Sequence, residues 1–280
     1  MNVLRAKTAG FCMGVSLALK KLDTALAHGT CRRIYTLGPL IHNPQVLSLY
    51  AEQGVVCADE TQHFSVNDCV VIRAHGIPRS LEESLRSSGV RVIDATCPKV
   101  KKAQLAIARA TREGASLLLF GEADHPEVRG LISYAAGRAC VLGTSAFSAP
   151  EIPTDLGLVL ASQTTQDRAA FLELEARVRA YDPNVRVLET ICDATKERQE
   201  EVRAIAGQVD IMVVVGGRQS GNTRRLADVS AACGIETVLV ETASELRAEN
   251  FAKKRCVGLT AGASTPNSVI DLAEKWLAAL

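Results

Sequence analysis

Residues 91–121 read RVIDATCPKVKKAQLAIARATREGASLLLFG, and this stretch predicts how the rest of the chain folds. A run of β-branched residues leads into a polar break that contains Cys97. A helix-like segment follows, and then an aliphatic strand that ends in glycine. Strands that alternate with helices over short connections are typical of parallel βαβ units. The stretch therefore predicts one such unit, with a cysteine in its first turn.

The same arrangement occurs two more times in the chain. Residues 186–216, RVLETICDATKERQEEVRAIAGQVDIMVVVG, repeat it around Cys192, and residues 2–38 repeat it around Cys12. The three strands end in glycines that follow their cysteines by 26, 24 and 24 residues: Gly38, Gly121 and Gly216. Each repeat continues with a polar loop, a second helix-like segment and a further aliphatic strand. Such self-similarity indicates a structural unit that is built three times.

We therefore expect an α/β fold of three small parallel-sheet domains in a pseudo-threefold (cloverleaf) arrangement, with the cysteine turns at its centre. Boundaries at those turns give domains of residues 12–96, 97–191 and 192–280. The first two domains end in a strand that leads to the next cysteine, whereas the third ends in a helix. We predict that residues 1–11 supply the missing strand and pair with the third domain.

Composition narrows the class of protein. The 280 residues are 47% hydrophobic and 22% charged, and the net charge is +1. A near-neutral chain gives no reason to expect nucleic acid or an anionic membrane as a partner. No run approaches the roughly 18–20 apolar residues of a membrane span, and the N-terminus does not read as a signal peptide. We therefore expect a cytoplasmic globular protein.

Nine cysteines are many for such a chain, and their number is odd. Disulfides are rare in a reducing compartment, so we expect no disulfide framework. Six cysteines are interpreted as small hydrophobes in or beside strands and helices: Cys31, Cys57, Cys69, Cys140, Cys233 and Cys256. The other three, Cys12, Cys97 and Cys192, each occupy a polar break between a strand and a helix, which packing does not explain.

Three thiolates without a fourth leave a metal or cluster with an open coordination position. Iron–sulfur clusters usually have four cysteine ligands, and an open position is what a catalytic metal centre requires. The three cysteines are 85 and 95 residues apart, so their spacing alone is a weak signal that the repeat strengthens. We favour an iron–sulfur cluster that reduces a small substrate. Structural zinc is the alternative, although closed zinc sites prefer a fourth Cys or His.

The remaining strand-to-helix loops carry hydroxyl, amide and imidazole groups. Ser220, Asn222 and Ser264 are expected at helix N-termini, where free backbone N–H groups and the helix dipole favour anions. Histidines in three further loops add donors: His42, His75 and His125. This set predicts a phosphate or diphosphate site built from several loops. Ser and Asn are also ordinary N-caps, which is the alternative interpretation for each one alone.

Glu127 is the carboxylate that lies in one of these loops beside a histidine and a proline. A carboxyl group that is held near a bound substrate can pass protons to it. A glutamate in the first turn of a helix can instead simply stabilise the helix dipole. The sequence leaves both interpretations open.

Nine segments together resemble the LytB family: GFCMGV, LGPLIHNPQV, RAHGIP, DATCPKV, HPEVRG, SQTT, TICDATKERQ, SGNTRRL and AGASTP. They occur in the family's order and cover essentially the whole chain. The family comprises the 4-hydroxy-3-methylbut-2-enyl diphosphate reductases of the methylerythritol phosphate route to isoprenoids. The resemblance implies an iron–sulfur oxidoreductase that makes isopentenyl and dimethylallyl diphosphates, with reduced ferredoxin or flavodoxin as its electron donor.

The resemblance also implies ligand sets. Cys12, Cys97 and Cys192 would bind a [4Fe–4S] cluster with one iron that lacks a protein ligand, and oxygen could convert it to a [3Fe–4S] form. The substrate would be contacted by the loop histidines and its diphosphate held by the hydroxyl and amide loops: His42, His75, His125, Ser220, Asn222 and Ser264.

Catalytic roles follow from the same resemblance. Thr164, in SQTT, would lie beside the substrate hydroxyl, and Glu127 would act in proton delivery. His125 would also count among the catalytic residues. The family often has a second serine where this chain has Gly221. Because the backbone N–H of Gly221 can still donate, we expect a modest effect on diphosphate affinity.

Two other functions fit parts of the pattern. The first is a quinolinate-synthase-like dehydratase that also uses three cysteines and a [4Fe–4S] cluster, but needs no net input of electrons. The HPEVRG and SGNTRRL loops count against it. The second is a non-enzymatic metal-sensing or zinc-stabilised protein, in which the same three cysteines would be structural ligands.

Overall fold

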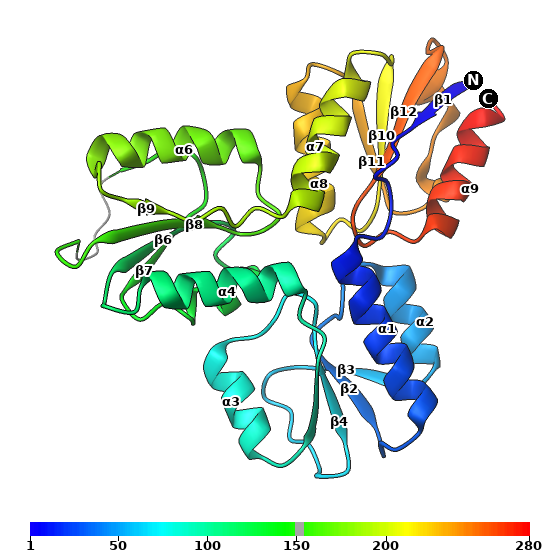
Figure 1. Ribbon diagram of the computed structural model, residues 1–280. Coiled ribbons are helices and arrows are strands. Elements are labelled where there is room, and N and C mark those ends of the chain that lie inside the picture. Colours follow the sequence, from blue (N-terminus) through cyan, green and yellow to red (C-terminus); the bar gives the residue numbers. More distant parts are fainter. Residues whose placement is uncertain (149–153) are drawn as a thin grey trace. The chain divides into compact units, whose positions relative to one another are not determined.

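The computed structural model describes residues 1–148 and 154–280, and its strands form three parallel four-stranded sheets (Figure 1). The chain divides into two compact units. The first unit comprises residues 1–15, 42–48 and 193–280, and the second comprises residues 16–41 and 49–192. The first contains one sheet and the second contains two. The expectation of three parallel α/β sheets is confirmed, while the boundaries at residues 12, 97 and 192 remain a proposal.

The first sheet in chain order lies in the second unit and has the order β3-β2-β4-β5. Its strands are β2 (Ile34–Leu37), β3 (Val55–Ala58), β4 (Cys69–Ile72) and β5 (Arg91–Asp94). The helices of this part of the chain are α1 (Met13–His28), α2 (Pro44–Glu52) and α3 (Arg79–Ser87). All the strand pairs are parallel, as expected when a helix separates consecutive strands.

The other sheet of the second unit has the order β7-β6-β8-β9. Its strands are β6 (Ser116–Phe120), β7 (Ala139–Leu142), β8 (Leu158–Ser162) and the two-residue β9 (Arg186–Val187). The accompanying helices are α4 (Pro98–Ala110), α5 (Pro126–Ile132) and α6 (Arg168–Tyr181). Leucines on β6 alternate between two apolar clusters, one against α4 and α5 and the other against α6.

The sheet of the first unit has the order β1-β12-β10-β11. Its strands are β1 (Asn2–Arg5), β10 (Ile211–Val215), β11 (Thr237–Val240) and β12 (Cys256–Ala261). The helices are α7 (Asp193–Ala206), α8 (Gly221–Ala232) and α9 (Asn267–Ala278). Two short 3₁₀ helices, η1 (Ala243–Glu245) and η2 (Ala248–Phe251), precede β12.

The three sheets share one topology. In each, the strand before a cysteine lies at an edge and pairs with the strand that ends in the last loop of the repeat: β5 with β4, β9 with β8, and β1 with β12. The register of β1 runs from Asn2 opposite Cys256 to Arg5 opposite Leu259. The N-terminal residues therefore supply the edge strand that the C-terminal part of the chain does not carry itself.

Helices cover both faces of each sheet, which explains why the central strands are continuously apolar (Figure 1). Ile211, Val213 and Val215 of β10 pack in one cluster with residues of α9, whereas Met212 and Val214 face α7 and α8. All five side chains are fully buried. No helix in the described parts of the chain combines the length and the apolar character that crossing a membrane requires.

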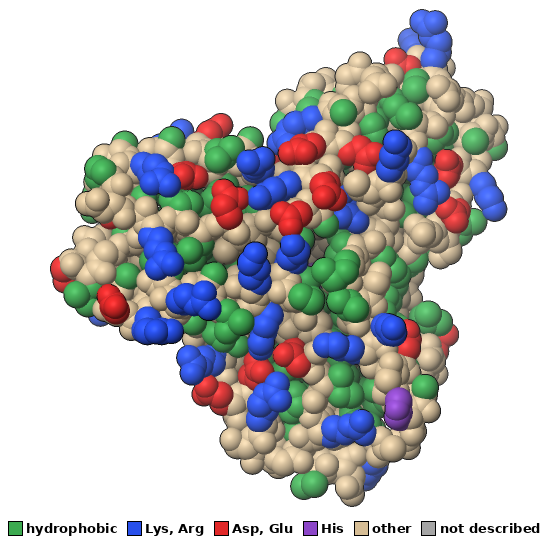
Figure 2. Space-filling model, in the orientation of Figure 1, with side chains coloured by type: hydrophobic (Ala, Val, Ile, Leu, Met, Phe, Trp, Pro, Cys, Tyr) green, Lys and Arg blue, Asp and Glu red, His purple; other side chains and the backbone are tan. Residues whose placement is uncertain are grey.

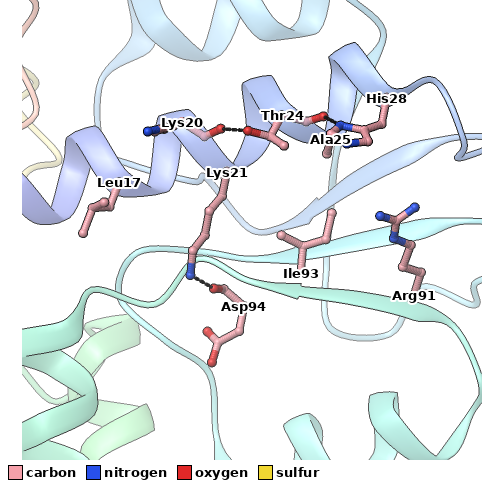
Figure 3. A pocket seen from close by; sticks show the side chains of 9 residues that line it. All are labelled: Leu17, Lys20, Lys21, Thr24, Ala25, His28, Arg91, Ile93 and Asp94. Atoms are coloured by element: carbon pink, nitrogen blue, oxygen red, sulfur yellow. Dashed lines mark hydrogen bonds between the residues drawn. The ribbon is translucent and has the colours of Figure 1, made fainter.

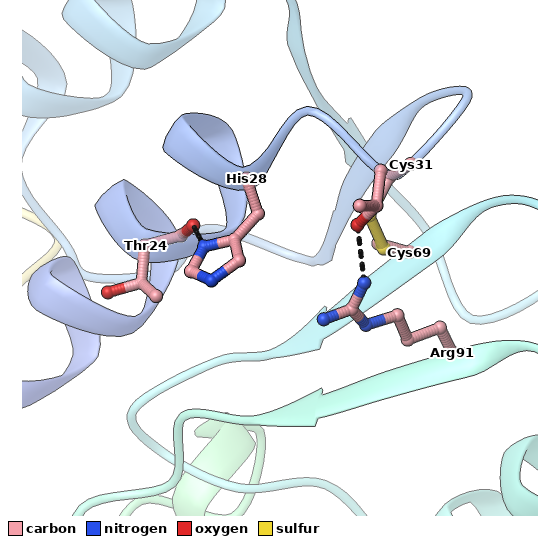
Figure 4. Close-up of a disulfide and its surroundings, with 6 residues drawn as sticks. Thr24, His28, Cys31, Cys69 and Arg91 are labelled. Carbon is pink, nitrogen blue, oxygen red and sulfur yellow. Dashed lines mark hydrogen bonds between the residues drawn. A yellow bond between two sulfur atoms is a disulfide. The ribbon is translucent and has the colours of Figure 1, made fainter.

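One expectation about the cysteines is wrong. Cys31 and Cys69 form a disulfide, with their Cα atoms 5.6 Å apart (Figure 4). The strand order explains the pairing, because β4 lies directly beside β2 although β3 separates them in sequence. The backbone N–H of Cys69 donates to the carbonyl of Arg33, just before β2, at 2.9 Å. Two residues interpreted as independent hydrophobes therefore share a covalent bond.

Candidate active site

Every predicted site residue follows a strand at its carboxyl end, where parallel sheets bind their ligands. The three cysteine turns are equivalent in their hydrogen bonds. The backbone N–H of Cys12 donates to the carbonyl of Ala263 at 3.1 Å, and that of Cys97 donates to Ala74 at 2.9 Å. The N–H of Cys192 donates to the carbonyl of Thr164, also at 2.9 Å. Each cysteine turn is thus fixed to the last loop of its own sheet.

Each of these cysteines is followed at once by a helix: α1, α4 or α7. Cys97 is the N-cap of α4 and has Pro98 at the first helical position, where proline is favoured. The backbone N–H of Val15 points at the sulfur of Cys12, 3.5 Å away. Helix N-termini favour anionic thiolates, the form that binds iron.

The three cysteines are the candidate ligands of an iron–sulfur cluster. All three side chains are half-buried, and none of them belongs to the Cys31–Cys69 disulfide. Cys97 and Cys192 belong to the second unit and Cys12 to the first. Each turn by itself holds a cysteine sulfur beside a helix N-terminus and is fixed by a backbone hydrogen bond, and sulfur ligands of this kind suit iron–sulfur clusters and similar metals.

A buried carboxyl group occupies the loop after β6. Glu127 lies in the first turn of α5 with 1% of its surface exposed, and its Oε1 accepts the backbone N–H of Thr164 at 2.6 Å. Burial raises the pKa of Glu127 to about 7, although the hydrogen bonds from Thr164 oppose the shift. A glutamate that only stabilised the dipole would lie in solvent. This one can hold or release a proton near neutral pH.

Two histidines of the second unit lie next to each other near this carboxyl group. His125 is the N-cap of α5, and its Nδ1 accepts the backbone N–H of Glu127 at 3.1 Å. The ring of His75, in the loop after β4, meets that of His125 edge to face, with the centroids 5.4 Å apart. The structure therefore brings together His75, His125, Glu127 and Thr164, all of them predicted site residues.

The first unit gathers a second group, which has no carboxylate among its predicted members. Ser220 is the N-cap of α8, and its Oγ accepts the N–H of Thr223 at 3.3 Å. The Oγ of Ser264 donates to the backbone carbonyl of His42 at 3.1 Å. Gly221 is the first residue of α8 and is buried. These loops present hydroxyl and N–H donors, the groups that hold phosphates at helix N-termini.

Asn222 gives this group an unused donor. Its side chain is 6% exposed, and its Nδ2 atom is buried without a hydrogen-bond partner among residues 1–148 and 154–280. A buried amide N–H that lacks a partner costs free energy, so such groups normally have an explanation. An acceptor atom supplied by a bound ligand would satisfy this donor.

Glycines allow the loops of the first unit to approach closely. A Cβ atom on Gly217 would lie 2.7 Å from the carbonyl oxygen of His42, and one on Gly262 would lie 2.0 Å from the hydroxyl of Thr223. Either contact would force the backbone apart. The glycines thus keep the His42 and Ser264 loops beside the N-terminus of α8.

Sequence reasoning missed two residues that support the cysteine turns. Arg198 is 5% exposed, and its Nη2 donates to the carbonyl of Gly10, two residues before Cys12, at 2.7 Å. The sequence could have indicated that Arg198 is buried, because it lies on the same face of α7 as the apolar residues Val202 and Ile205. Thr190, two residues before Cys192, bonds through Oγ1 to the backbone N–H and carbonyl of Ser162 at 2.8 and 2.7 Å.

Comparison with known proteins gives full-length similarity. A family model described as LytB protein matches residues 3–278. A relative from Desulfovibrio desulfuricans, named 4-hydroxy-3-methylbut-2-enyl diphosphate reductase, is 62% identical over 288 residues, which cover 100% of both chains. A relative of the same name from Aquifex aeolicus is 41% identical over 275 residues, which cover 97% of this chain and 94% of the relative.

Two solved structures are also similar. One is described as (E)-4-hydroxy-3-methyl-but-2-enyl diphosphate reductase, the terminal enzyme of the non-mevalonate pathway. It has a TM-score of 0.70 and 39% identity and covers 100% of this chain and 99% of its own. The other, the E-1-hydroxy-2-methyl-but-2-enyl-4-diphosphate reductase from Plasmodium falciparum, has a TM-score of 0.87 over 100% of this chain and 87% of its own. At 23% identity, the second likeness supports the fold alone.

Proposed function

This chain belongs to the LytB protein family, and from that premise we propose that it reduces (E)-4-hydroxy-3-methylbut-2-enyl diphosphate to isopentenyl and dimethylallyl diphosphates. In this reaction the allylic C–O bond breaks and the hydroxyl leaves as water. Two electrons and two protons are consumed, one proton going to the water and the other to carbon. The structural observation that supports the proposal is the set of three cysteine turns with equivalent backbone hydrogen bonds.

Cys12, Cys97 and Cys192 are the proposed ligands of a [4Fe–4S] cluster. When bound, the cluster supplies the electrons and, at the iron without a protein ligand, a Lewis-acidic position for the substrate hydroxyl. The backbone hydrogen bonds at Ala263, Ala74 and Thr164 hold the three turns in place before the cluster binds. Loss of the unprotected iron to oxygen would give the [3Fe–4S] form.

The diphosphate is assigned to the loops of the first unit. Ser220, Ser264 and the unused amide of Asn222 are its donors, together with the backbone N–H of Gly221 at the start of α8. These groups bind the part of the substrate that does not react. Binding there orients the reacting hydroxyl and supplies binding energy that is remote from the bond that breaks. His42, beside Ser264, and His75 and His125, in the second unit, are the further proposed contacts.

Glu127 and Thr164 are assigned to the proton. A carboxyl group with a pKa of about 7 is partly protonated at neutral pH and can donate to the leaving hydroxyl. The hydrogen bond from the backbone N–H of Thr164 fixes the direction of the carboxyl group. His125, which caps the same helix, is the adjacent group that can replace the proton.

The electrons are proposed to come from reduced ferredoxin or flavodoxin, and the location is proposed to be the cytoplasm. Reducing conditions there suit cysteines that act as cluster ligands, because disulfides seldom form in such a compartment. They would also keep the Cys31–Cys69 disulfide open to reduction.

The test is anaerobic turnover of the purified protein after its cluster has been loaded. The substrate is the hydroxymethylbutenyl diphosphate, and the reductant is dithionite with methyl viologen, so that no donor protein is needed. We expect both five-carbon diphosphates as products. Cys97→Ser should abolish turnover, whereas Cys140→Ser, in strand β7, should retain it. A fully loaded wild-type protein that makes neither product would overturn the proposal.

A further inference from the structure

A groove of about 480 Å³ lies between helix α1 and strand β5, within the second unit (Figure 3). Its apolar lining includes Leu17, Ala25 and Ile93. Leu17 is 38% exposed, Ile93 is half-buried and Ala25 is buried, so the floor of the groove is apolar.

The rim of the groove is cationic. Lys20 and Lys21 come from α1 and Arg91 from the start of β5. The carboxylate among the lining residues belongs to Asp94, and it is already engaged by the backbone N–H of Thr96 at 3.0 Å and by Lys101 at 3.4 Å. Figure 2 shows Lys and Arg side chains, with hydrophobic ones between them, on the face over α1. The groove therefore offers net positive charge around an apolar centre.

The three cations do not converge on one point. The Nζ of Lys21 donates to the backbone carbonyl of Asp94 at 2.5 Å, and Arg91 donates to the hydroxyl of Thr30, also at 2.5 Å. The ammonium of Lys20 is exposed and makes no hydrogen bond or ion pair with any part of the chain that the structure describes. A site for a small anion would bring its donors together. An apolar centre with a charged rim is instead the anatomy of a protein–protein interface.

The groove leads to one of the proposed cluster ligands. Asp94 is the last residue of β5, and Cys97 follows three residues later as the N-cap of α4. Lys21 is bonded to the backbone of Asp94 itself. A protein that covered the groove would therefore lie against the strand that ends in the Cys97 turn.

The far end of the groove is braced. Arg91 pairs in register with Cys69 of β4, and Cys69 is bonded to Cys31 (Figure 4). Thr30, which accepts the hydrogen bond from Arg91, immediately precedes Cys31. The pairing with β4 and the hydrogen bond to Thr30 limit the movement of Arg91 whether or not the disulfide is reduced. A rim that is already ordered loses less conformational entropy when a partner binds.

We propose that this groove is the docking surface for an acidic electron-carrier protein, which delivers electrons at the Cys97 turn. The inference rests on the proposed function, because that reaction consumes two electrons for each substrate. Carboxylates on the carrier would face Lys20, Lys21 and Arg91, and its apolar surface would cover Leu17 and Ile93. Such charge complementarity acts mainly on the rate of encounter and weakens with salt.

The experiment compares two reductants for the loaded enzyme: an acidic [2Fe–2S] ferredoxin, and dithionite with methyl viologen. Lys20→Glu should lower kcat/KM for the ferredoxin about tenfold at low ionic strength. The difference should disappear near 1 M salt, where the Debye length is about 3 Å. Turnover with the chemical reductant should not change. Arg177→Glu makes the same charge change on the exposed face of α6 and should leave both activities unaltered.

Ferredoxin binding is also measured by calorimetry, so that docking is judged separately from turnover. Equal ferredoxin affinity in the wild type and Lys20→Glu would overturn the docking proposal, as would equal loss of activity with both reductants. Competition by millimolar inorganic diphosphate for the groove, with no binding of ferredoxin there, would assign it to a small anion and would also overturn it. A wild-type enzyme that is inactive with the chemical reductant refutes the proposed function instead.

Discussion

The loops after β6 and β10 occupy the same place in their sheets but carry opposite chemistry. Each follows the central strand of its sheet, and each opens a helix whose N-cap is a predicted site residue: His125 for α5 and Ser220 for α8. In the first loop the next helical turn holds a buried carboxyl group, Glu127. In the second loop the same turn holds a buried amide, Asn222.

The difference shows that loops at equivalent positions of a repeated fold can carry different chemical groups. The shared topology fixes where a loop lies, while two or three residues set its chemistry, and we propose proton transfer for the first loop and anion binding for the second. The basic residue of the second loop, Arg218, does not contribute a free charge, because its guanidinium group is paired with Glu241 and Glu245. Hydroxyl, amide and backbone N–H groups are left to form the proposed anion site.

The largest expected effect is a loss of turnover on substitution of Glu127, in the loop after β6. Glu127→Gln keeps the shape of the side chain but removes the proton that the carboxyl group can exchange. Turnover should fall by about 10²- to 10⁴-fold, the usual contribution of a positioned acid or base, while the absorption spectrum of the loaded cluster stays the same. Asp124→Asn, an exposed change in the same loop, should alter turnover little. Near-normal activity in Glu127→Gln would remove that residue from the proton path.

The same carboxyl group should make stability depend on pH. The folded pKa of Glu127 is about 7 and its ordinary value is 4.5, so the folded state holds a proton that the unfolded state releases. This contribution is fully present below pH 4.5 and is lost as the pH rises through 7. It amounts to about 3 kcal/mol. Denaturant unfolding at pH 5 and pH 8 should show this fall in wild type but not in Glu127→Gln. Parallel pH profiles for the two proteins would contradict it.

In the loop after β10, Asn222→Ala should weaken substrate binding and leave the chemical step almost intact. A hydrogen bond to a charged group contributes about 1.5–3 kcal/mol, so KM should rise roughly 10- to 100-fold with little change in kcat. Asn184→Ala, at an exposed turn of the other unit, is the matched control. A lower kcat at unchanged KM would place Asn222 in the proton path and break the contrast between the loops.

The smallest effect concerns the position where this chain departs from the family pattern. Gly221 donates only its backbone N–H at the start of α8. Gly221→Ser adds a hydroxyl group beside Ser220 and Asn222, and a neutral hydrogen bond contributes about 0.5–1.5 kcal/mol. We expect a KM for the diphosphate about two- to tenfold lower. A KM that rises in Gly221→Ser would show that this position has no room for a side chain.

The sequence predicted the repeated strands because parallel strands covered on both faces leave an unmistakable aliphatic pattern. The sequence pattern predicted a longer strand before Cys192 than the structure has. RVLETI has the composition of a strand, yet β9 ends at Val187. Thr190 explains this difference, because its side-chain hydroxyl occupies the backbone N–H and carbonyl of Ser162 where a longer ladder would pair.

The sequence could not decide the site chemistry that depends on distant contacts. The carboxyl group of Glu127 is held inside the fold by a hydrogen bond from Thr164, which is 37 residues away. The Cys31–Cys69 bond likewise depends on β4 lying beside β2, a pairing that skips β3. Local patterns placed the candidate residues in loops that follow strands, but the fold determined which of them are buried and bonded.

The most direct test of the central claim is Mössbauer spectroscopy of protein loaded anaerobically with ⁵⁷Fe. If Cys12, Cys97 and Cys192 hold a [4Fe–4S] cluster, one iron should be distinct from the other three. Its signal should change when the hydroxymethylbutenyl diphosphate is added. The spectrum should be lost in Cys97→Ser and kept in Cys140→Ser. A colourless protein that holds zinc, or four iron signals that do not respond to the substrate, would contradict the account.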